Sequence, residues 1–307
     1  METPLPSSRG MLIPGARGKL LANCYLPGGP GPYPVVVLCH GIPGIERLMD
    51  FAIALRESGF AAVCFHYSGC FGSDGDYAVS HCMEDSRTVL DYILSNPFGD
   101  SDPERVFLLG HSMGGLMAAR TAALAPEVKA ACIMAPMDFR LAALEALEGP
   151  AGRYKDLIDV SAPWVRGLSW ESFTADAKAH IGEMDLISYA PALSEKPVLT
   201  VAAAQDALLP RADHIDRLNA AIECAGGVHF IRRAGALHQP PQKKAETAKR
   251  LTLCVSLFVF YSCLRKKSHT ASRAALLSAL KAWSLSKQSF SSFSPPAVSM
   301  AALSRSM

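Results

Sequence analysis

The stretch Leu108-Leu109-Gly110-His111-Ser112-Met113-Gly114-Gly115-Leu116 places a serine between glycines, directly after an apolar run. Residues 110–114 match the pattern Gly-x-Ser-x-Gly, in which a sharp turn between a strand and a helix exposes the serine hydroxyl. Side chains two positions before or after the serine would collide in such a turn, so both places need glycine. The pattern alone is weak, because a chain of this length contains it by accident about one time in ten. Its meaning therefore depends on what flanks it.

The flanking residues predict a strand before the serine and a helix after it. Residues 105–109 (RVFLL) form a short β-prone run that follows a turn-rich segment at 99–103. Residues 113–124 are rich in Ala, Leu and Met, which are strong helix formers, and this pattern stops near Pro126. Ser112 is therefore expected at a strand-to-helix turn.

Apolar runs alternate with helical patterns along most of the chain. Strands buried on both faces are predicted at 35–40, 61–67, 105–109, 130–135, 198–204 and 228–232. Helices are predicted near 47–58, 81–94, 113–124 and 212–224. This alternation predicts an α/β fold with a mostly parallel central sheet and helices on both faces. Residues 20–26 are expected to add an antiparallel edge strand near the start.

The alternation breaks between residues 137 and 196. This segment contains helical pieces, three prolines and two tryptophans, Trp164 and Trp170, but no clear strand. Structureless loops of this length are uncommon in compact domains. We therefore predict a small helical cap insertion at about 137–196, in preference to an ordinary helix with long loops.

The charge of the chain is unevenly distributed. Its 307 residues carry a formal net charge of +2. Residues 265–307 hold seven of the 30 Lys and Arg and none of the 28 Asp and Glu, so the remainder carries 23 − 28 = −5. Such a body argues against nucleic acid as its partner. Nine Cys without metal-ligand spacing, and no apolar leader before Pro14, favour reduced thiols, a cytoplasmic setting and no metal.

The last part of the chain has two segments of different character. Residues 251–264 are continuously apolar, and as a helix they would span about 21 Å, short of the ~30 Å hydrocarbon core of a bilayer. We favour a last helix packed on the sheet over a membrane-associated segment. Residues 265–307 are Ser-rich, basic and acid-free, which predicts a mostly disordered tail after a main domain at 1–264.

Together these motifs resemble those of the α/β-hydrolase superfamily, over roughly residues 20–264. Members of that family carry a catalytic triad in the chain order Ser, Asp or Glu, His. The resemblance implies Ser112 as the nucleophile, Asp206 as the acid in the turn after a late strand, and His238, in Gly-Ala-Leu-His, as the base. The imidazole would take the serine proton as the hydroxyl attacks a carbonyl, and the carboxylate would orient the imidazole.

The acid has alternatives, and the histidine loop departs from the family pattern. Asp138 follows the predicted strand at 130–135, where some members place the acid, and Asp185 lies in the expected cap. His238 is followed by Gln-Pro-Pro at 239–241 instead of an aromatic residue, and two prolines stiffen this exit. The placement of the histidine loop is therefore left open.

The resemblance also implies an oxyanion hole, which is a pair of backbone N–H groups that stabilise the negative oxygen formed on attack. One donor would be the N–H of Met113, directly after Ser112. The other would be the N–H of Ile42, in the loop His40-Gly41-Ile42-Pro43-Gly44. We expect His40 to be a buried residue that braces this loop, in preference to a catalytic one.

A second glycine-rich loop follows the predicted strand at 61–67. Residues 68–75 (SGCFGSDG) resemble the Gly-x-Gly-x-Ser loop of the family, which shapes the wall of the site. A phosphate-binding loop is excluded because no Lys follows and Gly-x-Gly-x-x-Gly is absent. Cys70 is expected to be a small buried thiol and not a nucleophile.

The resemblance implies a serine hydrolase that cleaves a small-molecule carboxylic ester through an acyl-enzyme on Ser112, with no cofactor. Residues 35–115 look most like small esterases of the cinnamoyl or feruloyl type. They also resemble the catalytic domains of acylaminoacyl- and prolyl-oligopeptidase enzymes, so a serine peptidase is one alternative. A non-catalytic binding protein on the same fold is another. The acyl and alcohol groups and the oligomeric state are left open.

Overall fold

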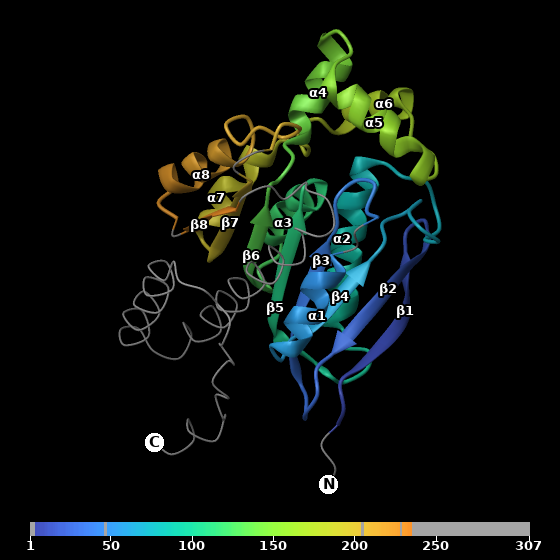
Figure 1. Ribbon diagram of the computed structural model, residues 1–307, viewed down its shortest axis with the longest axis vertical. Helices are drawn as coiled ribbons and strands as arrows, with labels where there is room; N and C mark the ends of the chain where they lie inside the picture. The colour runs from blue at the N-terminus through green and yellow to red at the C-terminus, as the bar shows by residue number, and fades with distance from the viewer. Residues whose placement is uncertain (1–3, 46–47, 204–205, 228, 235–307) are drawn as a thin grey trace, which may run out of the picture. The chain divides into compact units, whose positions relative to one another are not determined.

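The computed structural model describes residues 4–45, 48–203, 206–227 and 229–234 of the chain (Figure 1). These residues form one eight-stranded sheet in the order β1-β2-β4-β3-β5-β6-β7-β8. The strands are β1 (Ser7–Gly15), β2 (Gly18–Leu26), β3 (Tyr33–Cys39), β4 (Ala61–Phe65), β5 (Ser101–His111), β6 (Val128–Met134), β7 (Val198–Ala203) and β8 (His229–Ala234). All neighbours from β4 to β8 are parallel, whereas β2 pairs antiparallel with β1 and with β4.

The mostly parallel sheet confirms the predicted α/β fold class. The predictions for His238, for the apolar run at 251–264 and for the tail at 265–307 concern positions outside the described residues. Among the residues that are described, no helix combines the length and the apolar content that a bilayer crossing needs.

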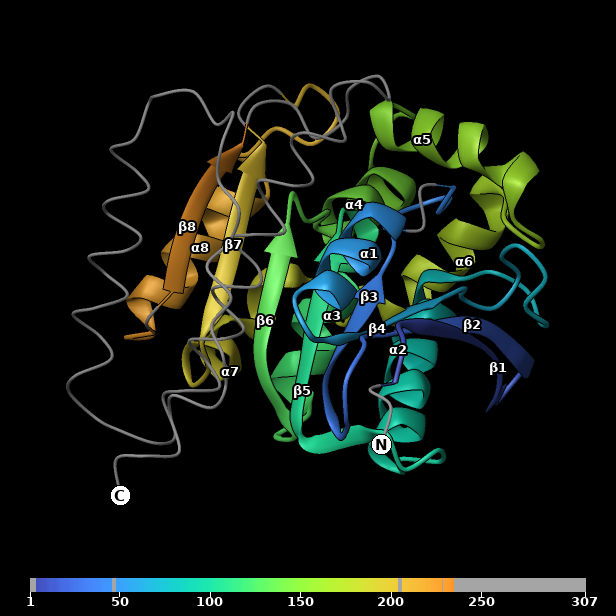
Figure 2. The same cartoon turned by 60° about the horizontal axis from the view of Figure 1, so that its bottom comes forward.

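Helices cover both faces of the sheet (Figure 2). Helix α1 (Met49–Glu57) lies on one face, and α2 (Val79–Leu94), α3 (Met113–Leu124) and α8 (Ile215–Cys224) pack on the other. The strands explain this division, because alternate side chains of a strand point to opposite faces. In β3, Val36 and Leu38 pack with α1, while Val35 and Val37 join the core on the α2 and α3 side.

The edge of the sheet differs from the expectation. Residues 20–26 were expected to form the edge strand, but β2 lies one place inward and β1 forms the edge. The two strands pair in register from Ser7 opposite Leu26 to Gly15 opposite Gly18. In β1 only Met11 and Ile13 are buried. An edge strand pairs along one side and can be half exposed, so β1 carries no long apolar run that sequence reasoning could detect.

An ion pair that is buried on its acidic side fastens this edge hairpin to α2. Arg17, in the turn between β1 and β2, donates from Nη2 to Asp85 Oδ1 at 3.1 Å, and Asp85 is 1% exposed. The other carboxylate oxygen of Asp85 accepts from the N–H of Ser68 at 2.7 Å. The loop after β4 is therefore held by the same carboxylate that holds the hairpin.

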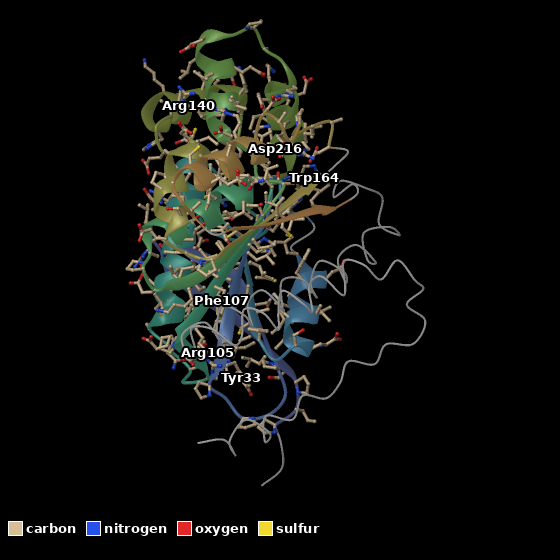
Figure 3. All side chains as sticks on the ribbon, turned by 90° about the vertical axis from the view of Figure 1, so that its left-hand side faces the viewer. Tyr33, Arg105, Phe107, Arg140, Trp164 and Asp216 are labelled. Carbon is tan, nitrogen blue, oxygen red and sulfur yellow. The ribbon has the colours of Figure 1, made fainter. Side chains whose placement is uncertain are left out.

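Residues 137–196 are mostly helical. They form α4 (Phe139–Glu148), α5 (Arg153–Ser161), α6 (Trp170–His180) and α7 (Ala190–Ser194), with two short 3-10 turns at Ala162–Trp164 and Leu186–Tyr189. Figure 1 shows α4, α5 and α6 grouped beyond one end of the sheet, while α7 lies beside α8. In Figure 3 Arg140 and Trp164 lie at this end, and Tyr33 and Arg105 lie at the opposite end.

The insertion is joined to the loop after β4 through backbone hydrogen bonds. The N–H of Arg166 donates to Gly69 O at 2.8 Å, and the N–H of Tyr77 donates to Arg166 O at 2.8 Å. Cys70 and Val165 form an isolated antiparallel bridge at the same place. The helical segment therefore meets the main sheet domain at the end where β3, β4, β5 and β6 terminate.

Candidate active site

Ser112 occupies a strained turn between β5 and α3. Its backbone has φ 57° and ψ −121°, a region that residues with a Cβ rarely adopt. The surrounding structure holds it there: its N–H donates to Met134 O at 3.0 Å, and its C=O accepts from the N–H of Met137 at 3.0 Å. Strain of this kind persists only where neighbouring structure imposes it, and it concentrates at functional sites.

The two glycines of the motif are required by direct backbone contacts. A Cβ on Gly110 would lie 1.9 Å from Gly114 O, and a Cβ on Gly114 would lie 1.9 Å from Cys39 O. The first contact is the collision within the turn that the sequence predicts. The second brings the first turn of α3 against the end of β3, a strand that is more than seventy residues earlier in the chain.

The loop after β3 is braced by a buried histidine, as expected. His40 is 1% exposed, its Nδ1 lies 2.7 Å from Gly41 O, and its ring packs against the edge of Tyr67. Gly44 has φ +96°, and a Cβ on it would lie 2.2 Å from His40 Nδ1. Only glycine therefore lets the loop fold back over the His40 ring.

Met113 begins α3, so its N–H has no carbonyl partner four residues earlier within the helix. The positive end of the helix dipole also lies here, which favours negative charge near Ser112. The Met113 side chain is fully buried, and its Sδ lies 2.7 Å from the hydroxyl of Tyr77. Because Gly114 packs on Cys39, the start of α3 and the loop that contains Ile42 lie together.

Asp206 lies just beyond the carboxyl end of β7, two strands along the sheet from β5. Its Oδ1 accepts from the N–H groups of Leu208 at 3.1 Å and Leu209 at 3.0 Å. Leu209 is buried in the main core, which anchors this turn. Two of the three expected triad residues, Ser112 and Asp206, thus lie at the carboxyl end of the sheet. The third, His238, is outside the described residues.

The carboxylate of Asp138, the alternative acid, binds backbone N–H groups of the insertion. It is 1% exposed and caps α4, with Oδ1 accepting from the N–H groups of Arg140 at 3.2 Å and Leu186 at 3.3 Å. Its Oδ2 lies 3.6 Å from Nη1 of Arg217. Burial raises the pKa of the Asp138 carboxyl above its usual range, while the two N–H donors and Arg217 oppose that rise.

The weaker alternatives are also engaged in local structure. Asp185 caps the 3-10 turn at Leu186–Tyr189, where its Oδ1 accepts from the N–H of Ile187 at 3.0 Å. Cys70 is fully buried, and burial raises the pKa of its thiol to about 12. A thiol in that environment stays protonated, in agreement with the expectation that Cys70 is not a nucleophile.

His214 also lies at the carboxyl end of the sheet, and no role was predicted for it from the sequence. The predicted helix at 212–224 contains it, but α8 begins only at Ile215, and His214 lies buried just before it. Its ring contacts both Asp138 and Tyr154 of α5. No local pattern marks such a residue, because its burial depends on helices that the chain forms 60 to 76 residues earlier.

A groove of about 610 Å³ lies on the α1 face of β1, β2 and β4. Leu12, Leu21, Tyr25, Met49 and Phe71 are among its mostly apolar lining residues. None of Ser112, Met113 or Asp206 lines it. In the part of the chain that the structure describes, no group of three or more His, Cys, Asp or Glu is placed to hold a metal ion.

Two curated proteins share sequence with part of the chain. An uncharacterized 31.7 kDa protein in the traX-finO intergenic region of Escherichia coli is 33% identical over 119 residues, which is 37% of this chain and 40% of that protein. Acyl-coenzyme A thioesterase 3 of Mus musculus is 30% identical over 122 residues, which is 40% of this chain and 27% of that protein. The chain therefore spans less than half of the length of these relatives.

Solved structures share the fold over most of the chain. The acylaminoacyl peptidase of Pyrococcus horikoshii superposes with a TM-score of 0.64 at 15% identity, over 90% of this chain and 44% of that chain. An esterase of Pyrobaculum calidifontis superposes with a TM-score of 0.53 at 19% identity, over 83% of this chain and 86% of that chain. At such identities the likeness establishes the fold alone.

A family model decides the assignment. The model described as the alpha/beta hydrolase fold matches residues 34–191, which are 158 of the 307 residues. The matched segment runs from β3 to the start of α7 within the insertion, contains Ile42, Ser112 and Met113, and ends before Asp206. The chain therefore belongs to the alpha/beta hydrolase fold family.

Proposed function

We propose that the protein is a serine hydrolase that cleaves carboxylic esters, with Ser112 as nucleophile, His238 as general base and Asp206 as the acid. One observation carries the proposal: Ser112 is held at φ 57° between β5 and α3, with glycines where any side chain would strike backbone. A serine that served only in packing would not need this strained backbone conformation.

The proposed reaction has two steps. As Ser112 Oγ bonds to the carbonyl carbon of the ester, His238 takes the hydroxyl proton, and the N–H groups of Ile42 and Met113 receive the negative oxygen. The C–O bond to the alcohol then breaks, and the imidazolium returns the proton to the leaving alkoxide. Water, deprotonated by the same imidazole, attacks the acyl carbon. The bond from that carbon to Ser112 Oγ breaks, and the imidazolium returns its proton to Oγ, which releases the carboxylic acid and free Ser112.

The geometry supports Asp206 over Asp138 as the acid. Asp138 is 1% exposed, caps α4 and receives an N–H from Leu186, so its carboxylate already completes the start of the insertion. Asp206 is partly exposed, and its Oδ1 closes its own turn by accepting from the N–H groups of Leu208 and Leu209. It lies after β7, the position that the family resemblance implies for the acid.

Ester hydrolysis is favoured over amide hydrolysis by the esterase among the similar structures and by the thioesterase among the relatives. Both of those proteins act on acyl groups carried by oxygen or sulfur. The similar acylaminoacyl peptidase keeps a serine peptidase as the second candidate. We further propose a small-molecule ester as the partner, a cytoplasmic setting, and residues 137–196 as a cap that shapes the substrate site.

Labelling with a fluorophosphonate probe tests the nucleophile. We expect the probe to modify the wild-type protein once, on Ser112, and not to modify Ser112→Ala. Ser95→Ala is the matched control, because Ser95 is exposed at the end of α2 and should leave labelling unchanged. Absence of labelling in the wild type would favour a non-catalytic binding protein on this fold.

Matched ester and amide substrates with the same acyl group separate the two enzymatic candidates. We expect kcat/KM for the ester to exceed that for the amide by more than the difference in their uncatalysed reactivity. A preference for the amide, normalised in this way, would assign the protein to the peptidase candidate.

A further inference from the structure

His214 connects three segments that meet beside the proposed acid. It is 1% exposed and lies between the turn that carries Asp206 and the start of α8. The N–H of Asp138, where the insertion begins, donates to His214 Nδ1 at 3.1 Å. His214 Nε2 lies 3.4 Å from the hydroxyl of Tyr154 in α5, and the two rings meet edge to face at 6.4 Å.

These contacts define the protonation of the ring. Because Nδ1 accepts an N–H from the backbone, it carries no proton, and the proton of the neutral ring lies on Nε2. Nε2–H can then donate to Tyr154 Oη, which also accepts from Nη2 of Arg153 at 3.0 Å. Both ring nitrogens are used in holding the insertion, so His214 is not available as a proton acceptor for Ser112.

A short hydrogen-bonded path joins His214 to Asp206. The Asp206 carboxylate closes its turn on the N–H groups of Leu208 and Leu209, and Leu209 is 3% exposed. From Pro210 a second turn follows, with the N–H of Asp213 donating to Pro210 O at 3.0 Å and the N–H of His214 to Arg211 O at 3.3 Å. Two hydrogen-bonded turns that follow each other in the chain therefore connect Asp206 to His214.

We propose that His214 is a positioning residue for the catalytic acid, and that its neutral ring locks the Asp206 turn against the start of α4 and against Tyr154 of the insertion. This inference rests on the proposed role of Asp206. It gives the insertion a second task besides shaping the substrate site, since the insertion also buttresses the triad. Removal of the ring would free the Asp206 turn and weaken the orientation of the general base.

The surroundings of His214 keep the ring neutral. Burial, and after it the positive charge of Arg153, lower the pKa of His214 to about 4, against the opposing influence of nearby carboxylates. The ionisable groups that face the ring come from several segments: Asp138, Arg153, Tyr154, Asp206, Asp213 and Arg217. A proton on Nδ1 would point at the N–H of Asp138 and break the contact, so the lock requires the neutral form.

The test compares two substitutions of this residue. His214→Leu removes both ring nitrogens, whereas His214→Asn places an oxygen near Nδ1 and keeps an acceptor for the N–H of Asp138. His180→Leu is the matched control, because His180 is partly exposed and its ring pairs with Glu183 at 3.2 Å. Each variant is assayed with p-nitrophenyl acetate from about pH 5 to about pH 9, and active sites are counted by fluorophosphonate labelling.

For His214→Leu we expect kcat per labelled site to fall by about 10- to 100-fold with KM within about threefold of wild type. The acid limb of kcat/KM should move to lower pH by about half a unit, because a carboxylate that is less well placed favours the protonated base less. His214→Asn keeps the contact to the N–H of Asp138 but not the one to Tyr154, so it should recover part of both changes, and His180→Leu should match the wild type.

A purely structural role would give a different result. It would reduce the number of labelled sites while the remaining sites kept their kcat and their acid limb, and that result would overturn the proposal. If His214→Leu does not fold, Tyr154→Phe keeps the His214 ring and removes the hydroxyl that contacts Nε2 and that also accepts from Arg153. A shift of its acid limb to lower pH supports the proposal, and an unmoved limb overturns it.

Asp206→Asn, measured in parallel, separates the two proposals. If Asp206→Asn keeps wild-type turnover, Asp206 is not the acid, and the proposed acid assignment and the positioning role both fail, while ester hydrolysis by Ser112 stands. If Asp206→Asn loses turnover while His214→Leu keeps the wild-type kcat per labelled site and acid limb, only the positioning role fails.

Discussion

Gly114 packs directly on the backbone of Cys39, so that a Cβ at residue 114 would lie 1.9 Å from Cys39 O and 2.6 Å from His40 O. This contact joins the first turn of α3 to the end of β3. It brings the start of α3, and with it Met113, close to the loop that contains Ile42. The two proposed oxyanion donors, the N–H groups of Ile42 and Met113, come from distant parts of the chain, and this contact brings their two segments together.

Gly114→Ala should therefore destabilise the protein strongly, because neither backbone carbonyl can move without displacing β3. We expect the free energy of unfolding to fall by about 3 kcal/mol or more, measured by urea denaturation. Gly182→Ala is the control, since nothing lies within 4 Å of a Cβ built there. It should change the unfolding free energy by less than about 0.5 kcal/mol. Equal effects at the two positions would contradict the close approach.

The two candidate acids should respond to substitution in opposite ways. Asp206→Asn should lower kcat by about 10³- to 10⁴-fold with little change in melting temperature, because the imidazole loses its orienting carboxylate. Asp138→Asn should keep most of the activity and lower the melting temperature, because an amide NH₂ replaces the buried oxygen that faces Arg217. If Asp138→Asn is instead the crippling change, the acid lies one strand earlier than proposed.

The Arg17–Asp85 pair should stabilise the edge hairpin measurably. Arg17→Met leaves the buried Asp85 carboxylate without its cation, so we expect a loss of about 2 kcal/mol in the free energy of unfolding. Arg87→Met is the matched control. Arg87 pairs with Asp91 at 2.6 Å on an exposed face of α2, and surface pairs of this kind contribute about 0–1 kcal/mol. Equal losses in the two variants would show that burial of Asp85 does not distinguish the pairs.

The stability of the protein should depend on pH through His214. Its pKa is lowered from 6.5 to about 4 in the folded protein, so the unfolded chain binds this proton more readily. The resulting stability is present above about pH 6.5, is lost as the pH falls from 6.5 towards 4, and amounts to about 3 kcal/mol when complete. Burial of Asp138, which raises its pKa, opposes the loss at the lower end of this window.

The comparison of wild type with His214→Asn isolates this contribution, since asparagine does not titrate. Between about pH 7.5 and about pH 5 the wild type should lose about 2 kcal/mol more unfolding free energy than the variant. Parallel pH profiles for the two proteins would show that His214 is not buried in its neutral form.

The order and type of the central elements could be predicted from the sequence. Strands buried on both faces and helices of three or four turns leave strong local patterns, and all seven predicted strands are present within a few residues of their expected bounds. The Ser112 turn could be predicted as well, because the collision between residues 110 and 114 is local. β1 was missed because only Met11 and Ile13 are buried in it, so this edge strand carries no long apolar run.

Sequence by itself thus determined the fold class and the strand-to-helix turn at Ser112, since both depend on side-chain periodicity and on sterics within a few residues. Only the tertiary structure decided the burial and the hydrogen bonds of the other groups at the carboxyl end of the sheet. Asp138 caps α4 through the nearby N–H of Arg140, but only the packing of the insertion brings it a second N–H from Leu186, 48 residues later. His214 is buried because Asp138 and Tyr154 close on its ring from segments far apart in the chain. Contacts between distant segments depend on how whole helices pack, and no pattern within one segment records that packing.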